Sequence, residues 1–290
     1  MRPAHKKTLN NAAMSSRLPK TDAPATGPLS SPARRKRTPA EGAAASESPD
    51  FITALARGLQ VLRCFEPGVP ALGNQDLARL TGLPKPTLSR ITYTLTSLGY
   101  LRYHADSGKY SPGYGVLALG YGLLANLDVR HLARPCMDSL ALETGAAVAL
   151  GTFDGDAMLY VEAVHGSASL YLRLPVGYRV SFGSAMGLAH LAALPEPQRA
   201  ALLASLGESA PSDQAMRQAL DDYRQTGACL ALGDWQPGIH AVAMPFTTVS
   251  REGTFVMSVG GPADLLPEPL LRERVVPLLR EAVARVAGLG

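Results

Sequence analysis

Hydrogen-bond donors and cations gather in one short stretch of the chain, between residues 85 and 93. Lysine, threonine, serine and arginine side chains can donate to phosphate oxygens and to base edges. Arg90 is the best candidate for reading guanine, because its planar guanidinium can bond O6 and N7 together, although a contact to phosphate alone is equally open. The candidate nucleic-acid contacts are Lys85, Pro86, Thr87, Ser89, Arg90, Tyr93, Arg102 and Lys109.

A second group of residues could hold a small anion. Ser184 follows Gly183 at the start of an expected helix, where free backbone amides and the helix dipole favour a carboxylate. Ser184 is also a natural N-cap, and the two roles are compatible. Trp235, the only tryptophan, either walls such a pocket or fills the core. The candidate effector contacts are Ser184, Ala185, Met186, Trp235, His240 and Ser258.

No motif in the sequence carries a catalytic mechanism. The six histidines lack metal-binding spacing, and the serine of Gly183–Gly187 stands one place too early for a nucleophile elbow. Cys136 on an apolar helix face favours packing, and Asp154, Asp156 and Glu162 flank an expected hairpin as solvated carboxylates. We therefore expect no enzyme activity, no catalytic residue, no metal and no cofactor.

The first group of residues belongs to two helical patterns that meet at a tight turn, within 73–99. Leu77 and Leu80 are the apolar positions of the first helix, and Thr81–Pro84 forms the turn. The second helix repeats apolar residues at a spacing of 3, 4 and 3, which places them on one face: Leu88, Ile91, Leu95 and Leu98. An apolar back and a polar, cationic front end are typical of a helix that enters a major groove.

The flanking segments extend this helix-turn-helix. A first amphipathic helix is expected over 52–65, and 100–111 reads as a hairpin with a turn at Asp106–Gly108. A helix, a helix-turn-helix and a β-hairpin together make a winged helix-turn-helix. Arg102, His104 and Lys109 on the wing could contact phosphates or a minor groove.

Charge is unevenly distributed along the 290 residues, whose net charge is +4. Residues 1–50 carry +5 and residues 51–112 carry +4, so residues 113–290 carry −5. A basic helix-turn-helix half with an acidic remainder predicts DNA binding and argues against a scaffold whose helices contact only protein. Residues 1–50, rich in Pro, Ala, Ser and Thr, are expected to be disordered; their Arg34–Arg37 run is either a solvated arm or a non-specific DNA contact.

The second half alternates strands and helices. Residues 113–126 predict a linker helix whose glycines allow close packing and a dimer contact, and 129–144 a further helix. Strands are expected at 146–153, 158–164, 170–174, 228–232, 239–247 and 254–259, and helices near 184–193, 197–206, 212–226 and 267–287, the last bent at Pro277. This order predicts an α+β domain on an antiparallel sheet. No apolar run is long enough to span a membrane, no secretory signal is visible, and scattered cysteines favour a reducing cytoplasm.

Several stretches in order along residues 51–290 resemble the IclR family of bacterial transcriptional regulators. In the first half these are LARLTGLPKPTLSRI and LTSLGYLRYHADSGKYSPG. In the second half they are LETGAAVALGTFDGDAMLYVEAV, LRLPVGYRVSFGSAMGLAHLA, YRQTGACLALGDWQPGIHAVAMPF and VMSVGGP. No single stretch is decisive, but their order and spacing together identify the family.

The resemblance implies a winged helix-turn-helix at 51–112, a linker helix at 113–128 and a GAF-like effector-binding domain with an antiparallel sheet at 129–290. It implies a homodimer or homotetramer that binds a double-stranded DNA operator and responds to a small organic acid, which could be aromatic. The chain departs from the family where Leu188 replaces a common lysine, Ala231-Leu232 an acidic pair and Ala241 a cysteine. These departures predict an effector different from the simple oxo-acids that some members bind.

Overall fold

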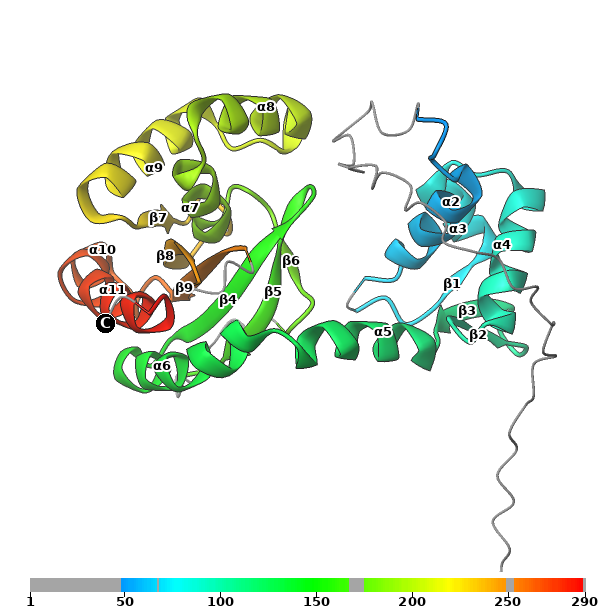
Figure 1. Ribbon diagram of the computed structural model, residues 1–290, viewed down its shortest axis with the longest axis horizontal. Helices are drawn as coiled ribbons and strands as arrows, with labels where there is room; N and C mark the ends of the chain where they lie inside the picture. Colours follow the sequence, from blue (N-terminus) through cyan, green and yellow to red (C-terminus); the bar gives the residue numbers. More distant parts are fainter. Residues whose placement is uncertain (1–47, 67, 167–174, 249–252, 289–290) are drawn as a thin grey trace, which may run out of the picture. The chain divides into compact units, whose positions relative to one another are not determined.

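The computed structural model describes residues 48–66, 68–166, 175–248 and 253–288. Nearly all of the 1–50 tail and the strand expected at 170–174 lie outside the described residues. The α+β architecture with a winged helix-turn-helix expected from the sequence is confirmed by the fold (Figure 1).

The first folded region is built from three helices and a small antiparallel sheet. The helices are α2 (Thr53–Arg63), α3 (Asn74–Thr81) and α4 (Lys85–Ser97). The strands are β1 (Leu72–Gly73), β2 (Leu101–His104) and β3 (Lys109–Pro112), in the order β1-β3-β2. Val61, Leu77, Leu88 and Leu101 form its core, each at most 1% exposed.

The turn between α3 and α4 follows from its glycine and prolines. Gly82 caps α3 at φ +68, a left-handed conformation that favours glycine, and its N–H donates to the Ala78 carbonyl. Pro84 then precedes α4 in an extended conformation, and Pro86 lies in the first turn, where its missing N–H has no intrahelical role. These residues end one helix and start the next within a few positions.

Two apolar positions expected in the core are exposed. Leu80 is 51% exposed and Leu98 is 63% exposed, whereas Thr92 is fully buried. The Thr92 hydroxyl donates to the Leu88 carbonyl at 3.0 Å, which allows its burial. Spacing placed Leu98 on the correct face, but as the C-cap of α4 it borders an open apolar groove beside α2 instead of the core.

Helix α5 (Tyr114–Ala125) follows the wing, and none of its 12 residues is buried. Its start packs closely against the turn between α4 and β2, because a Cβ on Gly113 or Gly115 would press on the Gly99 carbonyl. At Gly120 and Gly122, by contrast, a Cβ would meet no atom of another described segment within 4 Å. The helix therefore leaves most of an apolar surface uncovered within one chain.

The second folded region has one antiparallel sheet between two layers of helices (Figure 1). Its strands are β4 (Ala147–Asp154), β5 (Ala157–Val164), β6 (Arg179–Val180), β7 (Cys229–Leu232), β8 (Ile239–Thr247) and β9 (Thr254–Pro262), in the order β6-β5-β4-β9-β8-β7. Its helices are α6 (Asp128–Thr144), α7 (Ala185–Ala193), α8 (Glu196–Leu206), a 3-10 turn (Gly207–Ser209), α9 (Asp213–Thr226), α10 (Glu268–Leu270) and α11 (Val276–Val286).

Two separate cores lie on the two faces of this sheet. One joins α6 and α11 to the sheet through residues such as Met137, Leu140 and Leu279. The other joins α7 and α9 to the opposite face through Met186 and Met216, among others. Each face of the sheet is therefore buried, which explains why its strands are apolar on both sides.

The C-terminal helical segment differs from the single helix with a bend at Pro277 that the sequence predicts. A π-helical turn, Leu271–Val275, separates α10 from α11. Pro277 lies in the first turn of α11, just after this irregular stretch. Because proline cannot donate the i to i−4 hydrogen bond, the ladder is interrupted in the turn before it.

Candidate functional site

The solvent face of α4 carries the candidate nucleic-acid contacts. Lys85, Pro86, Ser89, Arg90 and Tyr93 are exposed there. Thr87 is half-buried at the edge of this face, beside the groove along α2. Leu88 and Thr92 anchor the opposite side of the helix in the core. The packing thus holds one polar, cationic face of α4 outward.

Within the part of the chain that the structure describes, the cations of this face and of the wing have no acidic partner. Among the described residues, Lys85, Arg90, Arg102 and Lys109 form no ion pair within 4 Å. The carboxylate of Asp76 accepts the Gly73 N–H at 3.0 Å instead, at the start of α3. Exposed, unpaired cations are the groups that can replace counterions on a phosphate backbone.

The wing is held together by side-chain contacts across its two strands. The rings of Tyr103 and Tyr110 lie 5.1 Å apart, and His104 Nε2 is 2.8 Å from Ser111 Oγ. The Arg102 guanidinium lies 5.6 Å from the ring centre of Tyr114, in the first turn of α5. Arg102 therefore makes a cation–π contact within the chain, whereas Lys109 is exposed at the start of β3.

A pocket lies beside the start of α7 in the second region; it encloses about 600 Å³ of empty space, part of which is open solvent at its mouth. It is lined by residues of the sheet, by the first turn of α7 and by the loop after β7. The structure brings together five of the predicted effector contacts here: Ser184, Ala185, Met186, Trp235 and Ser258. Much of the remaining wall consists of small side chains: Ala147, Ala149, Ala163, Ala231 and Ala241.

The N-cap and first turn of α7 contribute three residues to the cavity wall: Ser184, Ala185 and Met186. Ser184 is the N-cap: its Oγ accepts the Gly187 N–H at 3.2 Å and donates to the Ser181 carbonyl at 2.7 Å. The amides of Ala185 and Met186 belong to the first turn, which has no intrahelical acceptors. Close packing of Gly187 on the Phe182 backbone fixes the direction of this turn.

The polar side chains of the cavity wall are the hydroxyls of Tyr160, Ser184 and Ser258, the indole of Trp235 and the imidazole of His165. Burial raises the pKa of the Tyr160 hydroxyl above its usual value, while a hydrogen bond with Ser258 partly opposes this rise. The hydroxyl therefore stays protonated at neutral pH. Within the described wall there is no Lys, Arg, Asp or Glu; His165 is its one imidazole. Any anion bound here would therefore be stabilised by backbone amides, hydroxyls and this imidazole.

His240 does not line the cavity. Its Nδ1 lies 2.9 Å from the Leu266 carbonyl. Its neighbours Ile239 and Ala241 do line the cavity, and side chains alternate between the two faces of a strand. Applied to β8, this alternation would have placed Ala241 on the face towards the cavity and His240 on the opposite face. Sequence reasoning missed Tyr160, and strand alternation could not have found it, because a register shift in β5 lets Tyr160 and Ala163 both line the cavity.

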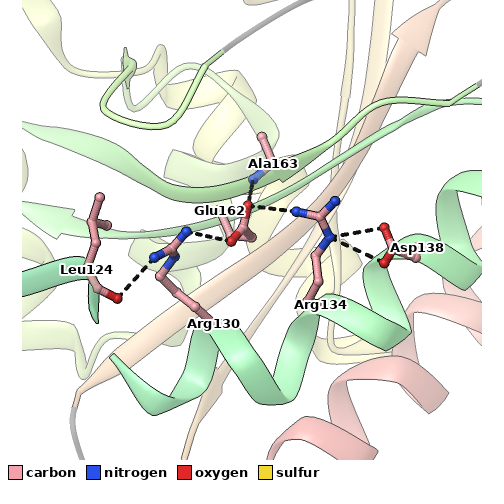
Figure 2. A network of polar contacts seen from close by, with 6 residues as sticks. All are labelled: Leu124, Arg130, Arg134, Asp138, Glu162 and Ala163. Carbon is pink, nitrogen blue, oxygen red and sulfur yellow. Dashed lines mark hydrogen bonds and ion pairs between the residues drawn. The ribbon is translucent and has the colours of Figure 1, made fainter. Parts of the chain in front are cut away.

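Glu162 is buried, contrary to the solvated position that the sequence suggests. It is 7% exposed and lies between Arg130 and Arg134 of α6 (Figure 2). Hairpin position alone could not reveal this, because both arginines come from a helix some 30 residues earlier in the chain. Asp154 and Asp156, in contrast, pair with Arg179 near the tip of the same hairpin.

Other chemical sites are not supported by the described part of the chain. It contains no group of three or more side chains arranged to hold a metal ion. Cys64 and Cys136 are half-buried free thiols, and burial raises the pKa of the Cys229 thiol. None of the helices described is long and apolar enough to cross a membrane.

Both regions match models of known protein families. Residues 54–105 match the IclR helix-turn-helix domain, and residues 121–287 match the C-terminal domain of the bacterial transcriptional regulator IclR. HTH-type transcriptional regulator TsaQ1/TsaQ2 of Comamonas testosteroni is 30% identical over 241 residues, which are 80% of this chain and 86% of that protein. The Pca regulon regulatory protein of Pseudomonas putida is 26% identical over 88% of this chain and 87% of its own length.

Solved structures share the fold. An IclR family transcriptional regulator from Brucella abortus superposes with a TM-score of 0.77 at 41% identity, covering 87% of this chain and 97% of that one. An IclR homologue from Microbacterium hydrocarbonoxydans, solved with 4-hydroxybenzoate, has a TM-score of 0.64 at 23% identity, over 81% of this chain and 98% of its own.

These relatives are regulators of transcription and not enzymes, in agreement with the absence of a catalytic motif. The matched families cover the helix-turn-helix and the sheet domain in their expected order. The chain belongs to the IclR family, as a transcriptional regulator with a helix-turn-helix DNA-binding domain and a C-terminal effector domain.

Proposed function

We propose that this regulator reads a double-stranded DNA operator with α4 and the wing, and that a small organic acid bound in the C-terminal cavity changes its affinity for that operator. The observation that carries the proposal is the pairing of an exposed, unpaired cationic face on α4 with an apolar cavity at the start of α7. In this proposal residues 51–112 form the DNA-binding domain, 113–128 the linker helix and 129–290 the effector-binding domain. The regulator acts in the cytoplasm.

On the DNA side, Arg90 is the proposed base-reading residue. It lies in the exposed first half of α4, and its fork can bond two acceptors of guanine at once. Lys85, Ser89 and Lys109 are proposed to contact phosphates, and Pro86, Thr87, Tyr93 and Arg102 to complete the surface. Phosphate contacts position the helix on DNA without reading its sequence.

Replacing Arg90 tests the DNA side. Arg90→Ala should weaken operator binding by about 1–3 kcal/mol and relax specificity at one base pair, whereas Lys109→Ala should weaken binding to all sequences and reduce the salt slope by about 1. Arg217→Ala is the control, since it removes the same charge from an exposed position on α9. Unchanged operator affinity of Arg90→Ala in a binding titration would refute the assignment.

On the effector side, the cavity favours a compact monoanion with a flat apolar body. The amides of Ala185 and Met186 supply hydrogen bonds for a carboxylate. The small alanine side chains of the wall leave room for an apolar ring, and Trp235 can cover it. A second carboxylate would find no Lys or Arg side chain among the described wall residues. 4-Hydroxybenzoate is the natural first probe, since a homologue with this fold was solved with it.

Two matched N-cap serines test the effector side. Ser184 and Ser212 each accept a backbone N–H at 3.2 Å, but only Ser184 lines the cavity. Replacing either by alanine should cost about 1 kcal/mol of stability. Only Ser184→Ala should also weaken 4-hydroxybenzoate binding, measured by calorimetry and by Trp235 fluorescence. Equal ligand affinity in both variants would contradict a site at α7; if no carboxylate binds the wild type, the sensing proposal fails.

We also propose that two copies associate through α2 and α5, as a homodimer or within a homotetramer. Leu55 and Leu59 of α2 and Leu117 and Leu123 of α5 are each at least 53% exposed, and Leu119 borders the groove along α2. A continuous apolar surface of this kind is typical of an interface. A two-fold dimer would place two copies of α4 on the two half-sites of an operator.

A further inference from the structure

The Glu162 carboxylate is the centre of a buried polar network (Figure 2). Its Oε2 accepts a hydrogen bond from Arg130 Nη2 at 2.8 Å, and its Oε1 lies 3.4 Å from Arg134 Nη1. The same Oε1 accepts the N–H of Ala163, the next residue of β5, at 3.1 Å. One carboxylate thus connects a strand of the sheet to two successive turns of α6.

The two arginines differ in what else they hold. Arg134 is half-exposed and donates through Nε to Asp138 at 3.1 Å, one turn later in the same helix. Arg130 is more buried, and its Nη1 donates to the Leu124 carbonyl of α5 at 3.0 Å. Only Arg130 therefore joins β5 to the helix that precedes α6.

The contacts with Glu162 and Leu124 explain why a cation is tolerated at position 130. It lies in the first turn of α6, where the helix dipole disfavours a cation. The Leu124 carbonyl lies in the last turn of α5, where carbonyls have no intrahelical donor and a cation is favoured. Asn126 caps a second carbonyl of this turn, that of Gly122, at 2.6 Å, but has no contact with the sheet in the described network.

The strand end of the network reaches the cavity wall. Ala163 and Val164 line the cavity directly after Glu162, and Tyr160 lines it just before. The pairing of β4 with β5 shifts register here: Leu150 faces Glu162 but Gly151 faces Tyr160, so Val161 is an extra residue. Such bulges bend a strand and redirect its side chains. A ligand that moves this wall would therefore move the carboxylate that holds Arg130.

We propose that Arg130 is the positioning residue that couples the effector cavity to α5. The connection runs from the Ala163 amide through Glu162 and Arg130 to the Leu124 carbonyl. Occupation of the cavity shifts β5, the carboxylate moves with it, and Arg130 changes its hold on the last turn of α5. The role in operator control rests on the proposed function above; the mechanical link between β5 and α5 does not.

Arg134 provides a matched control for this proposal. Arg130→Gln and Arg134→Gln each remove one positive charge next to Glu162, and each leaves the other arginine to balance the carboxylate. Because a partner remains, neither variant leaves an uncompensated buried charge, and both are expected to fold. They differ in the bond to Leu124, which only Arg130 makes.

The first experiment needs neither ligand nor DNA. Hydrogen exchange in the full chain should show faster exchange at the last turn of α5, by about fivefold or more, in Arg130→Gln but not in Arg134→Gln. Glu162→Gln, which does not touch α5, should produce the same change, and should add nothing in the Arg130→Gln background. If Glu162→Gln leaves exchange in α5 unchanged, or if its effect persists fully without Arg130, the proposal is wrong.

The second experiment measures coupling itself, as the ratio of operator affinities with and without saturating 4-hydroxybenzoate. In Arg130→Gln this ratio should fall towards 1 while the affinities for acid and operator each stay within about threefold, and Arg134→Gln should keep the wild-type ratio. An unchanged ratio in Arg130→Gln, or equal loss in both variants, would overturn the proposal. Absence of any acid binding to the wild type would refute the proposed effector and leave the exchange experiment to decide the link.

Discussion

Helices α5 and α7 are nearly alike in composition and opposite in environment. Both are apolar around their whole circumference and carry no charged side chain: YGVLALGYGLLA for α5 and AMGLAHLAA for α7. In α7, eight of nine residues are buried, between the sheet and α9. In α5, none of 12 is buried within the chain. An apolar helix must be covered, but composition does not say by what.

The difference separates two kinds of role. The cover of α7 is internal, so its packing supports the fold and fixes the amides at the cavity. The cover proposed for α5 is a second copy of the chain, so its surface supports association. Substitutions in the two helices should therefore change different measured quantities, and the four predictions below run from the largest expected effect to the smallest.

Leucine truncation should separate the two helices most strongly. Leu188 of α7 is 1% exposed and Leu117 of α5 is 67% exposed. Leu188→Ala should lower the free energy of unfolding by about 2–5 kcal/mol, because it leaves a cavity in a packed core. Leu117→Ala should change the stability of the single chain by about 0.5 kcal/mol or less. Denaturant titrations at low and high protein concentration measure both; a large effect of Leu117→Ala at low concentration would show that α5 is covered within one chain.

Glycines of the two helices should respond in opposite directions. A Cβ on Gly187 would collide with the Phe182 backbone, whereas a Cβ on Gly120 meets open space. Gly187→Ala should destabilise by about 1–3 kcal/mol through overpacking. Gly120→Ala should stabilise the chain by up to about 1 kcal/mol through helix propensity. If Gly120→Ala instead weakens association, then a partner helix packs closely at this glycine, which sharpens the proposed interface.

A charge on α5 should weaken association without unfolding the chain. Leu117→Glu should raise the dissociation constant of the dimer by about tenfold or more, since the carboxylate must be desolvated at the interface. Sedimentation equilibrium measures this, and circular dichroism checks the fold. Leu142→Glu is the control, as Leu142 is 81% exposed on α6. Equal association of wild type and Leu117→Glu would remove α5 from the interface.

The smallest effect concerns the imidazole within α7. Burial lowers the pKa of His190 below its usual value of 6.5, and its ring stacks on Phe153 with centroids 5.0 Å apart. Below about pH 6.5 the unfolded chain takes up this proton more readily than the folded chain, so stability should fall as pH decreases towards the folded pKa.

His190→Gln should reduce this acid slope in urea titrations, because it removes the buried titrating group. His131→Gln, at an exposed position on α6, should leave the slope as in the wild type. Parallel slopes for wild type and His190→Gln would show that other groups control the acid sensitivity of the second region.

Much of the fold could be predicted from short-range patterns. The tight turn at Gly82 and Pro84, the order of elements and the hairpin at Asp154–Gly155 depend on local conformational preferences. Errors arose where distant segments decide burial. Leu98 has the right spacing for the core, yet it is 63% exposed beside the groove along α2, and Thr92 is buried because its hydroxyl donates to a carbonyl one turn earlier.

The candidate sites show the same division. The exposed face of α4 follows from helical periodicity, so its residues could be named in advance. The cavity draws on β4, β5, β7, β8, β9 and α7 together, and only Ser184 and its neighbours carried a local signal for it. His240 was misplaced by one position of strand alternation. Glu162 was misjudged because its partners are contributed by another element.

The sequence by itself determined much of the local geometry of this protein: the order of most helices and strands, which face of α4 is polar, and that α5 and α7 must both be covered. The tertiary structure alone decided what covers α7, which small residues meet to leave a cavity, and that Arg130 joins β5 to α5. The physical reason is that backbone preferences act over a few residues, whereas burial and ion pairing depend on segments brought together from across the chain.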